Sequence, residues 1–401
     1  MTDTALTAAS TGATSKEKSW PPLYLVWGAL LLNVMSFTTI ELIVPIPRSL
    51  GQAIAQGALP LALVLALMLN RRLAIRPNSM VVMITVLAVV SLMVSLHSVF
   101  LVGSTYRALR VLAFVVVLWL LTPWWGRYSG ELLRAHVAVL SVGLATVVLG
   151  LAISPGRALA FEGRLSGVVW PIPPTQVAHY AAVVTGISAL GWLCRSVRPL
   201  VAMAGMGTGA ALLMLTHTRT GLIACIVAFG VAAMSLFLGS LRVRRVASAA
   251  VLVGIVAIPV LSGPISTWFL RGQTSTEASQ LTGRTKVWRE IVEMRRPWVE
   301  DWFGSGASNQ SFGGLPIDNG WLATYVDQGY FGVIGVALII VLLLGKVVQA
   351  HRSPHRAMAL FLIVYCVIAS FTETGLGTAS SYLLDLFVAG ALLTGRAEGD
   401  Q

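Results

Sequence analysis

Three arginines lie in short polar motifs between apolar segments. Arg164 is in Gly163-Arg164-Leu165-Ser166-Gly167, Arg219 is in the motif at 216–221, and Arg284 is in the motif at 282–288. A guanidinium is a planar fork of donors that matches phosphate oxygens and stays charged in a low dielectric. Few acidic residues lie near Arg164 and Arg219 in the sequence. A bound phosphate or diphosphate is therefore one candidate partner, and lipid headgroups are the other.

Candidate proton acceptors accompany these arginines. Asp318 begins the run Asp318-Asn319-Gly320-Trp321-Leu322, and His217 precedes Thr218-Arg219. An aspartate has an unperturbed pKa of about 3.9, so Asp318 is a weak base unless burial raises that pKa. The alternative for Asp318 is a helix N-cap. The alternative for His217, and for His179, is a hydrogen-bonded side chain between helices.

The composition indicates which elements position these residues. Of 401 residues, 56% are hydrophobic and 11% are charged, and the mean hydropathy is +0.81. Soluble domains carry about 25% charged residues, and a membrane-crossing helix needs about 20 apolar ones. We therefore predict an all-α polytopic membrane protein with about twelve transmembrane helices. The predicted segments are 23–40, 49–70, 80–101, 105–122, 133–153, 175–194, 199–216, 220–240, 246–262, 320–345, 357–372 and 379–395.

The charges predict the orientation. Every second connection between these helices carries at least two basic residues, such as Arg71 and Arg72 or Arg195 and Arg198. By the positive-inside rule, both termini and these connections are cytoplasmic. The net charge of +12 is then topological, and we expect no nucleic-acid partner. Residues 1–20 are predicted to form a disordered cytoplasmic tail, 21–262 helices 1–9, 263–318 an outer loop, and 319–396 helices 10–12.

The outer loop breaks the orientation rule, because it is basic. Its basic residues are Arg271, Arg284, Lys286, Arg289, Arg295 and Arg296. A local exception to a global rule marks a candidate functional region. Residues 283–296 are predicted to form an amphipathic helix on the membrane surface, and the Gly- and Ser-rich stretch 304–314 is predicted to be a flexible loop.

The order and spacing of the motifs resemble those of the bacterial O-antigen ligase and O-antigen polymerase superfamily. Asn319-x-Trp321-Leu322, followed by Asp327-x-Gly329-x-x-Gly332, is similar to the family signature after the large outer loop. The motif around Arg219 resembles the family's Thr-x-Ser-Arg-x-Gly element. Gly283-Arg284 and Arg164-Leu165-Ser166-Gly167 resemble its Gly-Arg and Arg-Leu-x-Gly elements. The likeness covers roughly 164–332, and Asp318 stands where the family usually has histidine.

The resemblance implies a C-type glycosyltransferase-like fold in the cytoplasmic membrane. It implies transfer of a glycan from a polyprenyl-diphosphate carrier to a glycan or glycolipid acceptor at the outer face of the bilayer, without a metal or other cofactor. The implied catalytic residues are Asp318, Arg219 and Arg284. The implied substrate-binding residues are Arg164, His217, Asn319, Asp327 and Arg289.

Other readings stay open at this stage. Polymerase and ligase activities are not distinguished, and an inactive relative that only binds lipid-linked sugar is a further option. A secondary transporter or flippase also suits twelve helices with both termini inside. Such a protein more often has ionisable residues near the bilayer midplane, and this sequence has almost none there, with Asp385 as the one clear exception.

Overall fold

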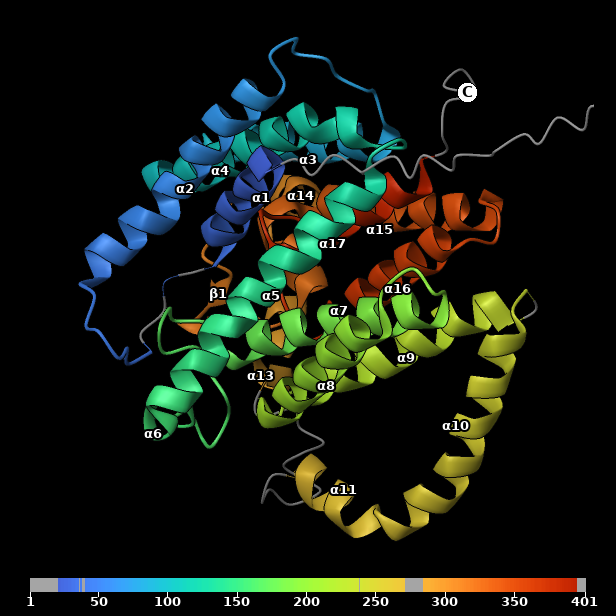
Figure 1. The fold of residues 1–401 in the computed structure, drawn as a ribbon. Helices are drawn as coiled ribbons and strands as arrows, with labels where there is room; N and C mark the ends of the chain where they lie inside the picture. Colours follow the sequence, from blue (N-terminus) through green and yellow to red (C-terminus); the bar gives the residue numbers. More distant parts are fainter. Residues whose placement is uncertain (1–20, 36, 38–39, 238, 271–283, 395–401) are drawn as a thin grey trace, which may run out of the picture.

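The computed structural model describes residues 21–35, 37, 40–237, 239–270 and 284–394, and Figure 1 shows that helices dominate them. The predicted tail at 1–20 lies outside the described residues. The helices are α1 (Pro21–Val34), α2 (Arg48–Leu69), α3 (Ser79–Ser95), α4 (Leu101–Leu121), η1 (Thr122–Trp124), α5 (Ser129–Ile153), α6 (Pro155–Ala158), α7 (Pro174–Leu193), α8 (Pro199–Leu215), α9 (Arg219–Phe237), α10 (Leu241–Val260), α11 (Ser262–Leu270), α13 (Arg284–Glu293), α14 (Trp298–Phe303), α15 (Gly320–Gln349), α16 (Pro354–Ala369) and α17 (Ser381–Leu393).

The helices have the character of a membrane protein. Each predicted segment overlaps a helix. In the described part of the chain, five helices are long and apolar enough to cross a bilayer, or six if the bent α10–α11 pair counts as one span. The five are α2, α4 with η1, α5, α9 and α15. The protein is therefore a helical membrane protein, and the number of twelve spans stays a prediction.

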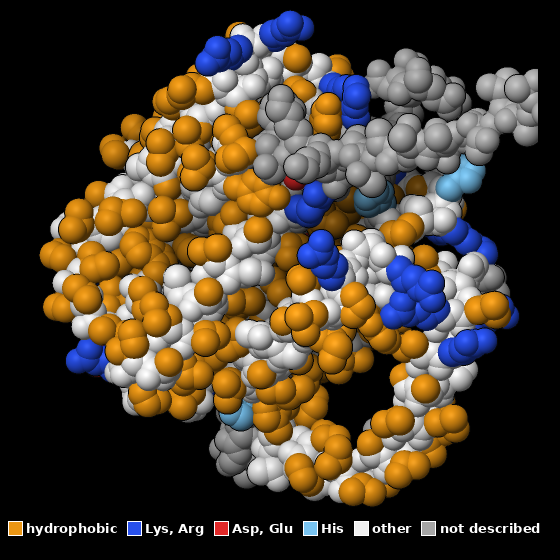
Figure 2. Space-filling view, in the orientation of Figure 1, with side chains coloured by type: hydrophobic (Ala, Val, Ile, Leu, Met, Phe, Trp, Pro, Cys, Tyr) orange, Lys and Arg blue, Asp and Glu red, His pale blue; other side chains and the backbone are white. Residues whose placement is uncertain are grey.

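The surface agrees with a lipid environment. Figure 2 shows hydrophobic side chains over most of the visible helices, while Lys and Arg side chains gather mainly along the upper and right-hand edges. On α10, Val251, Leu252, Val253, Ile255 and Val256 are each more than 60% exposed. Neighbouring positions of a helix point in different directions, so this half of α10 is apolar on every side, whereas its first turns carry Arg242, Arg244 and Arg245. Such a helix is stable only when lipid or protein covers it.

The core is built around α7, α16 and α17. α7 packs against α5, α8, α9 and α16, and α16 also contacts α9, α15 and α17. Every residue of α17 from Ser381 to Leu392 is buried. These helices therefore form the centre of the bundle, and α10 with α11 extends away from it as an arm (Figure 1).

The predicted outer loop is largely folded. It contains α11, α13, α14 and a short antiparallel hairpin of β1 (Ser311–Phe312) and β2 (Leu315–Pro316). On α13, Val287 and Ile291 are buried with Ile317 and with residues of α15. The predicted amphipathic helix therefore exists, but its apolar side packs on protein. The stretch predicted to be flexible is attached to α15, because the amide of Ser305 donates to the Val326 carbonyl at 3.0 Å.

The glycines of the motif after Asp327 have a structural role. Gly329 interrupts α15 with a φ of 62°. A Cβ at Gly329 would lie 2.4 Å from the carbonyl carbon of Trp302, and a Cβ at Gly304 would lie 2.3 Å from the Asp327 backbone. The end of α14 thus packs backbone to backbone against the kink in α15, which only glycine permits.

We predict that Gly329→Ala lowers stability by roughly 1–3 kcal/mol, because it adds both a steric clash and an unfavourable φ. Gly345→Ala is the matched control in the same helix, since its Cβ would meet nothing within 4 Å. It should be neutral or stabilising by up to about 1 kcal/mol. Thermal unfolding of both purified variants in detergent measures the difference, and equal melting temperatures would contradict this account of the kink.

Candidate functional site

Residues from four separate segments meet at one end of the bundle. Arg164 comes from the loop before α7, Arg284 begins α13, Asp318 precedes α15, and Glu373 lies between α16 and α17. These four residues form what we call the Arg164–Arg284 cluster. Their charges influence one another, which places them close together in the fold.

Arg164 ties its loop to the turn between α8 and α9. Its Nε donates to the Thr216 carbonyl at 3.1 Å, and its Nη2 donates to Thr218 Oγ1 at 3.2 Å. Burial lowers the pKa of Arg164, and the negative charge of Glu373 counteracts this shift. Arginine stays protonated in proteins, so Arg164 supplies a partly desolvated positive charge. Such a charge interacts strongly with an anion.

Arg284 and Asp318 form a half-buried ion pair. Arg284 Nε lies 3.0 Å from Asp318 Oδ2, and the two side chains are 29% and 32% exposed. Arg284 Nη1 also donates to the Thr372 carbonyl at 3.4 Å. Ion pairs of this exposure contribute about 0–1 kcal/mol. An incoming anion can therefore replace the Asp318 carboxylate on Arg284 at little cost.

Glu373 is the member of the cluster that sequence reasoning missed. Burial raises the pKa of Glu373 from 4.5 to about 7, and Arg284 acts in the opposite direction. Thr175, in the first turn of α7, donates a hydrogen bond to its carboxylate. The available signal was an acidic residue in the connection between the last two helices, on the same predicted face as Arg164. A carboxyl group with a pKa near 7 is suited to general-base chemistry.

Asn319, and not Asp318, caps α15. The Asn319 Oδ1 accepts from the amides of Trp321 and Leu322, both at 3.0 Å, and its Nδ2 donates to the Phe371 carbonyl at 3.2 Å. The interpretation of Asp318 as an N-cap is therefore wrong. Asp318 has a φ of 42° and turns its carboxylate toward Arg284.

Arg219 and His217 face the α11 side of the fold. Arg219 Nη2 donates to the Leu270 carbonyl at 3.2 Å. The His217 ring stacks on Trp268, with 5.6 Å between ring centroids. Both of these contacts involve α11.

Arg289 and Asp327 have different surroundings. Arg289 is exposed on α13 and lines a shallow hollow of about 480 Å³ with Asn319 and Trp321. Asp327 is 2% exposed and accepts from the Ser308 amide at 3.1 Å. Asp327 lies seven positions after Gly320, the first residue of α15, which is about 10 Å along the helix axis. Asp327 therefore orders the segment after α14, and its role in substrate binding stays a prediction.

A second polar group lies inside the bundle. Asp385 on α17 is fully buried between two histidines. His136 Nε2 on α5 lies 2.7 Å from Asp385 Oδ1, and His179 Nε2 on α7 lies 3.0 Å from Asp385 Oδ2. Trp27 Nε1 donates to His136 Nδ1 at 2.9 Å. The sequence singled out Asp385 alone, because nothing in it showed that the two histidines share this carboxylate.

The hydrogen bonds determine the protonation of His136. An indole N–H only donates, so His136 Nδ1 accepts from Trp27 and His136 Nε2 carries the proton that reaches Asp385. His136 is therefore neutral. A lone carboxylate in an apolar interior is strongly unfavourable. With His136 neutral, the three side chains together are uncharged only if one further proton is present, on His179 or on the Asp385 carboxyl group.

Within the described residues, no group of three or more His, Cys, Asp or Glu side chains is arranged to hold a metal ion. The sequence matches no model of a known protein family, and no curated protein is detectably similar to it. The functional assignment therefore depends on the chemistry of the residues themselves.

We predict that Asp385→Ala destabilises the protein by about 3–5 kcal/mol, because it leaves both histidines without their buried partner. Asp385→Asn should cost less, since its amide oxygen accepts from His136 and its amide nitrogen donates to a neutral His179. Thermal unfolding in detergent, with exposed Glu290→Ala as the control, measures this order. An alanine variant as stable as the asparagine variant would contradict the protonation assigned to the two histidines.

Proposed function

We propose that this protein transfers a glycan from a polyprenyl-diphosphate carrier to a hydroxyl of a glycan or glycolipid acceptor. The proposal places it in the cytoplasmic membrane, with both termini in the cytoplasm and the Arg164–Arg284 cluster at the outer face. The observation that carries the proposal is the convergence of two guanidinium groups with a carboxyl group whose pKa is near 7.

Each group has a distinct task in this reaction. Arg164 and Arg284 bind the diphosphate and stabilise the negative charge that it gains as it leaves. The acceptor oxygen attacks the anomeric carbon as the carbon–oxygen bond to phosphate breaks, and the diphosphate departs with that electron pair. The proton of the acceptor hydroxyl passes to a carboxylate.

We assign the base to Glu373 in place of Asp318. The Asp318 carboxylate is already paired with Arg284, whereas Glu373 is partly buried and has a pKa near 7. A base works best when its pKa is close to the working pH. Asp318 then acts as a positioning residue that holds Arg284 until the diphosphate binds.

We predict that Glu373→Gln lowers turnover by about 10²–10⁴-fold while carrier binding is retained. Because the pKa of Glu373 is raised to about 7, the wild-type rate should fall as pH drops below 7 and Glu373 becomes protonated. Exposed Glu162→Gln, in the same loop as Arg164, is the control and should keep the wild-type rate. The assay is in vitro transfer from a purified polyprenyl-diphosphate glycan across a pH series.

The arginines supply the second arm of this assay. Arg284→Ala should weaken carrier binding about tenfold or more, since a charge-assisted hydrogen bond contributes about 1.5–3 kcal/mol. Arg284→Lys should recover little of this loss, because lysine lacks the planar fork. Wild-type transfer by both Glu373→Gln and Arg284→Ala would remove the cluster from the reaction.

The buried cluster favours a second candidate function, a proton-coupled transporter or flippase. Ionisable residues inside a membrane bundle commonly mark proton or substrate pathways, and His136, His179 and Asp385 are fully or almost fully buried. This function predicts that Asp385→Asn abolishes pH-gradient-driven movement of a lipid-linked glycan across proteoliposome membranes. The transferase proposal predicts that this stably folded variant retains glycan transfer. The two readouts together distinguish the functions.

A further inference from the structure

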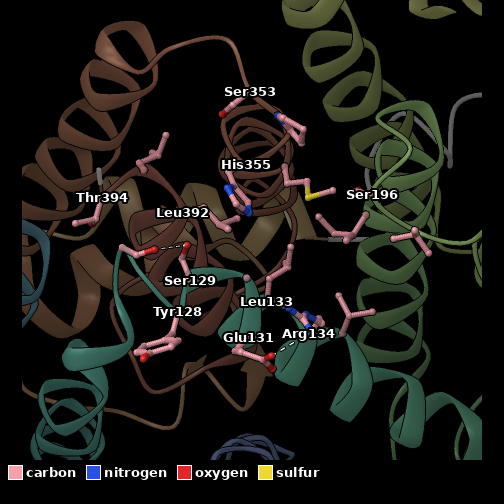
Figure 3. A pocket seen from close by; sticks show the side chains of 18 of the residues that line it. Tyr128, Ser129, Glu131, Leu133, Arg134, Ser196, Ser353, His355, Leu392 and Thr394 are labelled. Carbon is pink, nitrogen blue, oxygen red and sulfur yellow. Dashed lines mark hydrogen bonds and ion pairs between the residues drawn. The ribbon is translucent and has the colours of Figure 1, made fainter. Parts of the chain in front are cut away.

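A large cavity opens at the end of the bundle opposite the Arg164–Arg284 cluster. Its volume is about 1800 Å³. α16 connects the two ends, because its first residue, Pro354, lines the cavity, whereas Phe371, just beyond its last residue, accepts a hydrogen bond from Asn319. Figure 3 shows side chains from the start of α5, the start of α16 and the end of α17 arranged around the hollow.

The polar rim of this cavity is strongly basic. Its arginine and lysine side chains are Arg127, Arg134, Arg198 and Lys346. Two histidines, His351 and His355, add to the rim, and the only acidic residue among the described lining residues is Glu131. Glu131 lies 3.1 Å from Arg134 and forms an ion pair with it (Figure 3). Arg198 and Lys346 keep the rim positive, which favours an anionic occupant.

The walls of the cavity are apolar. They include Val137, Ile187, Val201, Met358, Leu392 and Leu393. Val201 is 60% exposed at the start of α8, next to Leu200 at 81%, so this side of the cavity has an apolar outer edge. A soluble anion would gain nothing from such walls. An occupant with an anionic headgroup and a hydrocarbon chain can pair with the basic rim and pack against the apolar walls.

We propose that this cavity binds an amphiphile with a phosphate headgroup, with its phosphate at the basic rim and its chain along the apolar wall. A volume of 1800 Å³ exceeds the 300–1,000 Å³ typical of small-molecule pockets, which suits a headgroup together with part of a chain. By the predicted orientation this end is cytoplasmic, where bilayers carry anionic lipid. Anionic phospholipids and polyprenyl phosphates both combine a phosphate headgroup with a hydrocarbon chain, so both fit this site. The inference is independent of the proposed transferase activity.

Native mass spectrometry of the delipidated full-length protein tests this proposal. The probes are phosphatidylglycerol, cardiolipin, a polyprenyl monophosphate and, as the uncharged reference, phosphatidylcholine. We expect saturable binding of the phosphate-bearing anions and weak binding of phosphatidylcholine. Competition between phosphatidylglycerol and the polyprenyl phosphate identifies which source of the headgroup binds more tightly.

Variants locate the site. Arg198→Ala/Lys346→Ala should bind about 30-fold more weakly, since each cation near a lipid phosphate contributes about a fivefold factor. Arg71→Ala/Arg72→Ala is the matched control, because these cations share the predicted cytoplasmic face and do not line the cavity. Ala138→Phe narrows the cavity without altering its charge and should also weaken binding. The proposal would be overturned if all three variants bound phosphatidylglycerol equally well. It would also be overturned if the wild-type protein bound phosphatidylcholine as tightly as phosphatidylglycerol.

Discussion

The carboxylate of Asp385, held between two buried histidines, constrains the whole bundle. It requires α5, α7 and α17 to bring His136, His179 and Asp385 to one point, and α1 to bring Trp27 to His136. Side chains from four helices meet only if those helices keep a fixed register. Helix packing in a membrane lacks a strong hydrophobic drive, so polar contacts of this kind specify which faces meet.

This buried register also fixes the Arg164–Arg284 cluster. His179 lies one helical turn beyond Thr175 on α7, and Thr175 donates to the carboxylate of Glu373. The connection that carries Glu373 leads directly into α17, which begins at Ser381 with a Ser380 cap. The helix that carries Asp385 thus anchors one side of the Glu373 loop, and the helix that carries His179 binds its acidic residue. The cluster is made of loop residues, but rigid helices hold those loops.

The sequence was sufficient to predict where the helices lie, because apolar length and charge placement are local properties of a chain. The sequence predicted one face for Arg164, Arg219 and Arg284; in the structure Arg284 pairs with Asp318 and lies close enough to Arg164 to affect its pKa, whereas Arg219 binds the Leu270 carbonyl. The contacts between the segments that connect the helices could not be predicted from the sequence. The sequence placed no partner beside Arg164, although Glu373 is there, and it named Asp318 as a possible cap where Asn319 has that role.

Other features were missed for the same reason. The glycine spacing after Asp327 did not show that Gly329 and Gly304 allow the backbones of α15 and α14 to touch. Gly- and Ser-rich composition suggested a flexible loop, whereas Asp327 and Val326 bind its amides. Backbone approach and loop hydrogen bonds depend on tertiary packing, which a single sequence does not display.

The raised pKa of Glu373 connects stability with the proposed reaction. Since its pKa is higher in the folded protein than in the unfolded chain, Glu373 favours folding fully below pH 4.5, and this contribution is lost as pH rises through about 7. Near neutral pH the folded site therefore holds a carboxyl group that ionises at some cost. A diphosphate bound to Arg164 and Arg284 would add negative charge and engage the cations that stabilise the Glu373 carboxylate. Both effects raise its pKa further, so carrier binding would strengthen the base at the moment when the acceptor proton must leave.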